Sequence, residues 1–128
     1  GLIVKAEYRG HGLAKRIKKT AFELSRKRFP NAKLFGLTTG LAVMKINTEL
    51  GYKPVTFSEL TTDPVFWKGC ESCINYDVLT RNNNTRCLCT GMLFDPAKDK
   101  PLSPLEKDSH DKLLHAWMKL RNFVHHEK

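Results

Sequence analysis

The sequence has no long hydrophobic run, because no stretch of its 128 residues approaches the roughly 20 apolar residues that a membrane-spanning helix needs. Residues 1–4 are apolar but lead directly into charge, so we expect no signal peptide, no membrane association and a cytoplasmic protein. Glycine (8 residues) and proline (6 residues) are too scarce for a collagen-like or low-complexity fibre. A hydrophobic fraction of 41% and a charged fraction of 27% are typical of one soluble globular domain.

Negative charge is also scarce. Thirteen Asp and Glu residues face twenty-two Lys and Arg residues, which gives a net charge of +9. This excess favours anionic partners such as nucleic acid, a phosphate-rich cofactor or an acidic substrate, and does not choose among them.

The first half of the chain alternates short apolar runs with helical patterns, which predicts an α/β (α+β) fold. We expect strands at 1–4 and 32–38, helices at 12–28 and 40–50, and an extended piece at 52–55. The predicted buried face of the first helix consists of Leu13, Ile17, Ala21 and Leu24. In the second helix we expect Leu41 and Met44 to point inward together with Val43 or Leu50, and Gly51 to follow the helix end.

The second half predicts a hairpin over 66–94, with a turn at 82–84 and strands before and after it. A polar linker follows, and the last helix begins at Ser103-Pro104-Leu105-Glu106, an N-cap followed by proline and glutamate. We therefore divide the chain into a domain over 1–95 and a linker with an amphipathic helix over 96–128. The apolar stripe of that helix, made of Leu113, Trp117, Leu120 and Val124, suits packing on its own domain or on a partner, including a second copy of the chain.

Glycines mark the turn between the first strand and the first helix, at Arg9-Gly10-His11-Gly12-Leu13-Ala14. The unpaired N–H groups of a helix N-terminus attract anions, and glycines let a phosphate approach the backbone. The pattern lacks the Lys-Ser/Thr of a P-loop and the third glycine of a dinucleotide fingerprint. By itself it fits a phosphate site and a plain connecting turn equally well.

The same residues resemble motif A of the GNAT acyltransferases, Arg/Gln-x-x-Gly-x-Gly/Ala, with Arg9, Gly12 and Ala14 in the fixed places. Leu50-Gly51-Tyr52 is similar to the Leu-Gly-Phe that closes a later helix of that family. The resemblance covers residues 1–60 and extends less specifically to Phe94. It implies a mixed, mostly antiparallel twisted sheet flanked by helices, of which this chain holds the C-terminal portion without the N-terminal strands.

The resemblance also implies a cofactor, acetyl-CoA or a related acyl-CoA such as succinyl-CoA. The turn would hold the CoA pyrophosphate and residues 2–4 would pair with the pantetheine arm. The implied cofactor-binding residues are Leu2, Ile3, Val4, Arg9, Gly10, His11, Gly12, Leu13, Ala14 and Lys15. The acyl group would pass directly to an amine, with a small amino acid such as glutamate as the favoured acceptor.

Catalytic groups are not evident. The place of the family's tyrosine acid is taken here by Asn47, which can hydrogen-bond but cannot donate a proton as tyrosine does. Glu7 and His11 are candidates for the general base, although each also fits a solvated loop side chain.

Four cysteines lie within twenty residues of one another, as Cys70-x-x-Cys73 and Cys87-x-Cys89. Four thiolates suit a tetrahedral structural zinc ion, and buried free thiols or disulfides are the alternatives. Together with the positive charge, such a site leaves two further functions open. One is a zinc-stabilised nucleic-acid-binding module, which the lack of interleaved aromatic residues disfavours. The other is a catalytically degenerate acyltransferase fold used for protein contacts.

Overall fold

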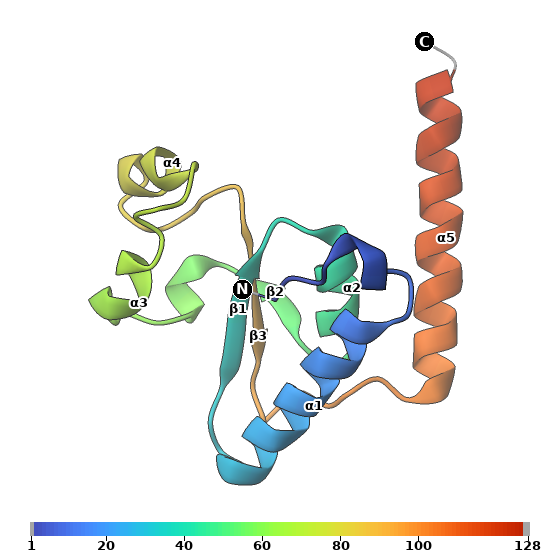
Figure 1. The fold of residues 1–128 in the computed structure, drawn as a ribbon, viewed down its shortest axis with the longest axis horizontal. Helices are drawn as coiled ribbons and strands as arrows, with labels where there is room; N and C mark the ends of the chain where they lie inside the picture. The colour runs from blue at the N-terminus through green and yellow to red at the C-terminus, as the bar shows by residue number, and fades with distance from the viewer. Residues whose placement is uncertain (1, 127–128) are drawn as a thin grey trace.

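The computed structural model describes residues 2–126, with the side chains of 2–122, and shows a mixed α+β fold (Figure 1). Five α-helices, two short 3-10 helices and three strands make up the described chain. In chain order they are η1 (Ala6–Tyr8), α1 (Leu13–Arg28), β1 (Leu34–Thr38), α2 (Leu41–Glu49), β2 (Lys53–Val55), η2 (Phe57–Glu59), α3 (Pro64–Lys68), α4 (Tyr76–Arg81), β3 (Thr90–Phe94) and α5 (Pro104–His126). The predicted α+β class and the first two helices are confirmed.

The sheet is antiparallel, and its last strand, β3, lies between β1 and β2. Leu34 pairs with Phe94 in β3, and Lys53 pairs with Leu93. Successive side chains of a strand point to opposite faces, so Met92 and Phe94 face one side and Leu93 the other. The sheet therefore has two apolar faces, and each needs its own cover.

The first face is covered by α1 and α2. Phe22 of α1 packs edge-to-face on Phe94 of β3, with 4.9 Å between the ring centroids. Leu50 completes the buried cluster, and Ile46 and Tyr52 lie against it. Burial of each large side chain contributes about 1.5–3 kcal/mol, so this small cluster holds both helices to the sheet.

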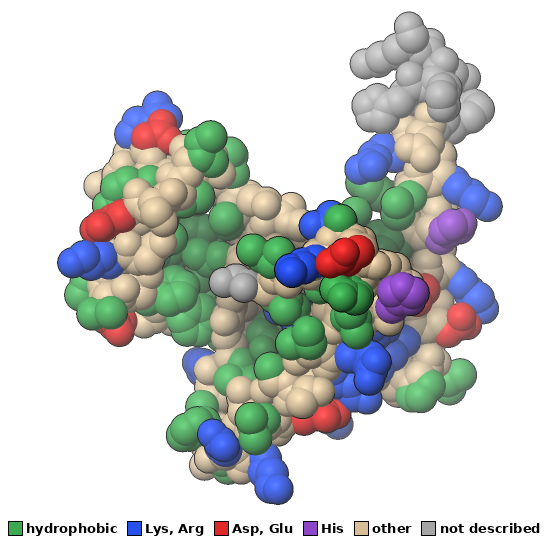
Figure 2. Space-filling model, in the orientation of Figure 1, with side chains coloured by type: hydrophobic (Ala, Val, Ile, Leu, Met, Phe, Trp, Pro, Cys, Tyr) green, Lys and Arg blue, Asp and Glu red, His purple; other side chains and the backbone are tan. Residues whose placement is uncertain are grey.

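The predicted inward face of α1 is wrong. The helix turns Phe22 to the sheet, which leaves Ile17 50% and Leu24 47% exposed. Figure 2 shows this hydrophobic stripe on the surface of α1. The edge-to-face contact of Phe22 with Phe94 fixes which face of α1 meets the sheet. Leu41 of α2, also predicted inward, is exposed, whereas Leu50 is buried in the cluster and Ile46 packs against it.

The second face is covered by the segment over 56–89. Phe57, Trp67 and Leu79 form its buried cluster against Leu37 of β1. Phe57 and Trp67 stack with 5.5 Å between ring centroids, and the indole N–H of Trp67 donates to the Thr61 carbonyl at 2.8 Å. In Figure 1 this segment, with α3 and α4, lies on the other side of the strands from α2 and α5.

The predicted hairpin over 66–94 is wrong, because its first half forms the short helices α3 and α4 and only Thr90–Phe94 is a strand. In α4 the helical spacing buries Leu79 and partly buries Tyr76, whereas Ile74 stays exposed. A strand over 73–79 would instead put Ile74 and Tyr76 on one face. The turn at 82–84 is confirmed, with left-handed backbone at Asn83 and Asn84.

The predicted strand at residues 1–4 is also wrong in the part described. Residues 2–5 belong to no strand and are not part of a β-sheet, and Ile3 is 85% exposed. Three or four residues gain little from an extended conformation without a neighbouring strand to hydrogen-bond.

The last helix, α5, begins where the sequence predicts. The amide of Ser103 donates to Glu106 at 2.8 Å, and the amide of Glu106 donates to the Ser103 hydroxyl at 3.3 Å, which is the reciprocal capping box. The helix lies beside α2 and its C-terminal half extends past the rest of the fold (Figure 1). Its stripe is exposed at Leu113, Trp117 and Leu120, and the side chain of Val124 lies outside the described residues. None of the described helices is long and apolar enough to cross a membrane.

Candidate cofactor-binding cleft

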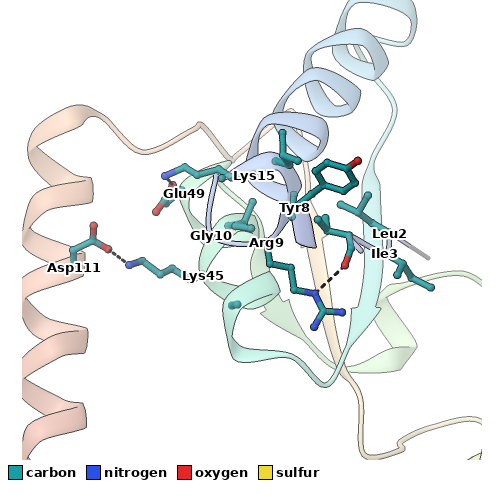
Figure 3. Close-up of a pocket in the computed structure, with 15 residues that line it drawn as sticks. Leu2, Ile3, Tyr8, Arg9, Gly10, Lys15, Lys45, Glu49 and Asp111 are labelled. Atoms are coloured by element: carbon teal, nitrogen blue, oxygen red, sulfur yellow. Dashed lines mark hydrogen bonds and ion pairs between the residues drawn. The ribbon is translucent and has the colours of Figure 1, made fainter. Parts of the chain in front are cut away.

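A cleft of about 680 Å³ opens where the N-terminal segment, the glycine turn, α1 and α2 meet, with one residue of α5 at its rim (Figure 3). This volume is in the range of small-molecule binding sites. Its lining is Leu2, Ile3, Val4, Tyr8, Arg9, Gly10, Gly12, Leu13, Ala14, Lys15, Ala42, Lys45, Ile46, Glu49 and Asp111. All the residues predicted to contact CoA line it except His11, which is exposed on the turn.

The glycine turn has the backbone of an anion site. Gly10 and Gly12 have φ angles of +84° and +71°, a conformation that other residues adopt at a cost of about 1–2 kcal/mol. A Cβ atom on either glycine would meet no atom within 4 Å, so open space adjoins the turn. The first α1 hydrogen bond runs from the Arg16 amide to the Gly12 carbonyl at 3.0 Å. The N–H groups before Arg16 in the first turn therefore have no helical acceptor and are free to bind an anion.

Arg9 joins the two backbone segments of the cleft. Its Nε donates to the carbonyl oxygen of Val4 at 2.9 Å, as Figure 3 shows. This bond holds the extended residues 2–4 beside the glycine turn. A short segment without β-pairing thus gains a fixed position next to α1.

The charged groups in the cleft are arranged in pairs. Lys15 Nζ lies 2.6 Å from Glu49 Oε2, and Lys45 Nζ lies 3.0 Å from Asp111 Oδ1 of α5. Both side chains of the second pair have substantial exposure, and the hydrogen bond that Lys45 donates to the Asp111 carboxylate lowers the pKa of Asp111. The Glu49 side chain is only 5% exposed, which makes it the buried carboxylate of the cleft.

The three predicted catalytic candidates do not line the cleft. Glu7 and His11 are exposed on η1 and on the turn. Asn47 is a buried residue of α2, and its Nδ2 lies 3.7 Å from the sulfur of Met92 in β3. Four polar residues that the sequence analysis missed, Tyr8, Lys45, Glu49 and Asp111, line the cleft instead (Figure 3). Nothing in the local sequence marks Glu49, because its place in the cleft depends on the packing of α2 beside α1.

The four cysteines come together on the opposite face of the sheet. Cys70, Cys73, Cys87 and Cys89 line one small cavity of about 20 Å³ and form no disulfide. Burial and then the neighbouring thiols raise the pKa of both Cys70 and Cys89. In the part of the chain that the structure describes, no three His, Cys, Asp or Glu side chains are arranged so that they could hold a metal ion.

No protein-family model, no curated protein and no solved structure matches this chain.

Proposed function

We propose that the chain carries the acyl-CoA-binding part of a GNAT-type N-acyltransferase, which moves an acetyl or succinyl group to an amine. The observation that supports it most is the convergence of residues 2–4, the glycine turn and the first turn of α1 on one cleft. These are the segments that the motif resemblance implies for the pantetheine arm and the pyrophosphate.

The cleft provides the groups that an acyl-CoA needs. The free amides after Gly12 suit the two charges of the pyrophosphate, and Arg9 adds a guanidinium beside them. Leu2 and Ile3 offer apolar contact to the pantetheine arm. The net charge of +9 favours the approach of an anionic cofactor and an acidic acceptor.

The reaction follows from the chemistry of a thioester and an amine. The neutral amine nitrogen attacks the thioester carbonyl carbon, the C–N bond forms, and the C–S bond breaks to release the CoA thiolate. The acceptor ammonium must first lose a proton, which a carboxylate can take. Glu49 is our candidate for this base, because it is the buried carboxylate lining the cleft.

Calorimetric titration of the chain with acetyl-CoA tests cofactor binding. We expect saturable binding that is at least about tenfold weaker in Gly12→Ala, since a side chain at φ +71° strains the turn and its Cβ occupies the approach to the backbone. Gly36→Ala in β1 is the matched control, because Gly36 has open space and no left-handed backbone. No binding by the wild type, or equal binding by a folded Gly12→Ala variant, would contradict the proposal.

Turnover is tested by mass spectrometry of N-acylated products after incubation with acetyl-CoA or succinyl-CoA and a panel of amino acids. Mass detection avoids thiol reagents, which would also react with the four free cysteines. Glu49→Gln should lower kcat by about two orders of magnitude and leave cofactor affinity within about threefold. Binding without turnover by any amine would favour the degenerate fold. Binding of nucleic acid that weakens steeply with salt, with no CoA binding, would favour the nucleic-acid module.

A further inference from the structure

The four cysteines are independent of the cofactor cleft. They lie on the face of the sheet that α3 and α4 cover, and they come from two separate segments. Cys70 and Cys73 follow α3, and Cys87 and Cys89 precede β3. We propose that these four residues are the ligands of one structural zinc ion, which closes the cavity that they line.

The first pair has the backbone of a metal-binding knuckle. The Cys73 amide donates to the Cys70 carbonyl at 2.9 Å, which makes the tight turn of the Cys-x-x-Cys segment. The amide of Asn75 then donates to the Cys73 sulfur at 3.5 Å. An N–H group aimed at sulfur orients and stabilises a thiolate ligand. This bond orients the Cys73 sulfur in the turn.

The second pair is brought to the first by the same residue. The Cys87 sulfur lies 3.5 Å from the Asn75 carbonyl oxygen, to which its S–H donates. Leu88, between the two cysteines, is 66% exposed, whereas Cys87 and Cys89 both line the cavity. Alternate residues thus point the same way, as chelation by Cys-x-Cys requires.

The cavity suits a single ion. Its volume of about 20 Å³ is close to that of one water-sized sphere, and its other walls include the apolar side chains of Leu37, Phe57 and Leu79. Four soft sulfur ligands with no open position favour tetrahedral zinc in a structural site.

The metal explains how this segment is held. The helices α3 and α4 have five and six residues, too few to be stable alone. The buried cluster of the segment contains only Phe57, Trp67 and Leu79. In the described residues the four thiols line one cavity but do not yet form a group that could hold a metal ion. A zinc ion would draw them in as each thiol releases its proton to solvent, and metal-binding free energy would become folding free energy.

The first test is the metal content of the full chain purified under reducing conditions. We expect about one zinc ion per chain. Serine substitution of Cys70, Cys73, Cys87 or Cys89 should lower zinc affinity against a chelator by at least about tenfold. Leu88→Ser is the matched control and should keep wild-type affinity, because its side chain points to solvent. Background zinc in the wild type, iron in its place, or four serine variants with wild-type affinity would overturn the proposal.

A second measurement uses the wild type alone, in case the variants fold poorly. Chelator-treated chain titrated with Co²⁺ should show the intense visible absorption of a tetrahedral site and the sulfur-to-cobalt charge transfer of four thiolates. The zinc-bound chain should also protect all four cysteines from alkylation until chelator is added. A weak octahedral cobalt spectrum, or cysteines that react equally fast with and without zinc, would overturn the proposal. Both tests are independent of acyl-CoA binding, so either proposal can fail alone.

Discussion

Lys15 of α1 and Glu49 of α2 form an ion pair at the wall of the cleft, with 2.6 Å between Nζ and Oε2. The two partners differ in environment, because the Glu49 side chain is 5% exposed and that of Lys15 is 56% exposed. A buried carboxylate needs a partner, and here an exposed lysine from the glycine motif's helix supplies it. The pair therefore links the turn that we assign to the pyrophosphate with the carboxylate that we assign to proton transfer.

Lys15→Ala should destabilise the protein by about 1–3 kcal/mol, because it leaves the buried Glu49 carboxylate unpaired. Urea unfolding measures this loss. The double variant Lys15→Ala with Glu49→Gln should lose less than the sum of the two single changes, since the uncompensated charge is gone. Lys19→Ala is the control on the same helix, because its pair with Glu23 lies in solvent and should contribute less than about 1 kcal/mol. Additive losses would contradict the pairing.

Gly51→Ala should be among the most destabilising small substitutions in the chain. Gly51 follows α2 with a φ angle of +93°, and a Cβ there would lie 2.3 Å from the Lys100 carbonyl oxygen. The left-handed backbone alone costs about 1–2 kcal/mol, and the linker must also move. We expect a clearly lower Tm and looser packing of α5, because the amide of Leu102 donates to the Glu49 carbonyl beside this contact. Gly36→Ala, with open space in β1, should change Tm little, and equal effects of the two would contradict the close approach.

Asp99 gives the protein a pH dependence in the acid range. Burial raises the pKa of Asp99, but hydrogen bonds from Lys53 and from the Asp95 amide outweigh it and hold the pKa below the ordinary value of 3.8. A carboxylate with a lowered native pKa stabilises the fold fully above its unfolded pKa, and this contribution disappears as the pH falls through the native pKa. Stability should therefore decline as the pH falls below about 4.

Asp99→Asn should be less stable than the wild type at pH 7 and should lose less stability between pH 5 and pH 3, as measured by urea unfolding across that range. The control is Asp77→Asn, because the ion pair of Asp77 with Arg81 is exposed and i,i+4 on α4. If the stability of the wild type and of Asp99→Asn falls equally as the pH is lowered, other carboxyl groups determine the pH dependence and the prediction is wrong.

Local signals in the sequence located several elements well. The capping box at Ser103 and Glu106 and the glycine after α2 are short-range patterns, and both are present in the structure. The glycine turn before α1 was also placed correctly, with left-handed backbone at Gly10 and Gly12. Each of these features depends on residues within one turn of chain, so neighbouring sequence is enough to specify it.

Predictions that depend on how one helix or strand packs against another were wrong. The stripe of α1 that contains Ile17 and Leu24 has helical spacing, yet the helix turns Phe22 to the sheet. The run from Cys73 to Leu79 has the composition of a strand and ends in a helix, because it packs on Phe57 and Trp67 rather than beside β3. The sequence analysis missed Glu49 in the candidate site for the same reason, because the burial of Glu49 depends on how α2 packs beside α1.

The sequence by itself determined the glycine turn and the turn at 82–84, where α1 and α2 begin and end, where α5 begins, and which residues carry the acyltransferase resemblance. These depend on backbone preferences and on hydrogen bonds between near neighbours. Only the tertiary structure decided which helix face is buried, which carboxylate lines the cleft and that four cysteines from two segments share one cavity. Those outcomes depend on contacts between residues far apart in the chain, where the competing apolar surfaces differ by only a few kcal/mol and the best-packed combination decides.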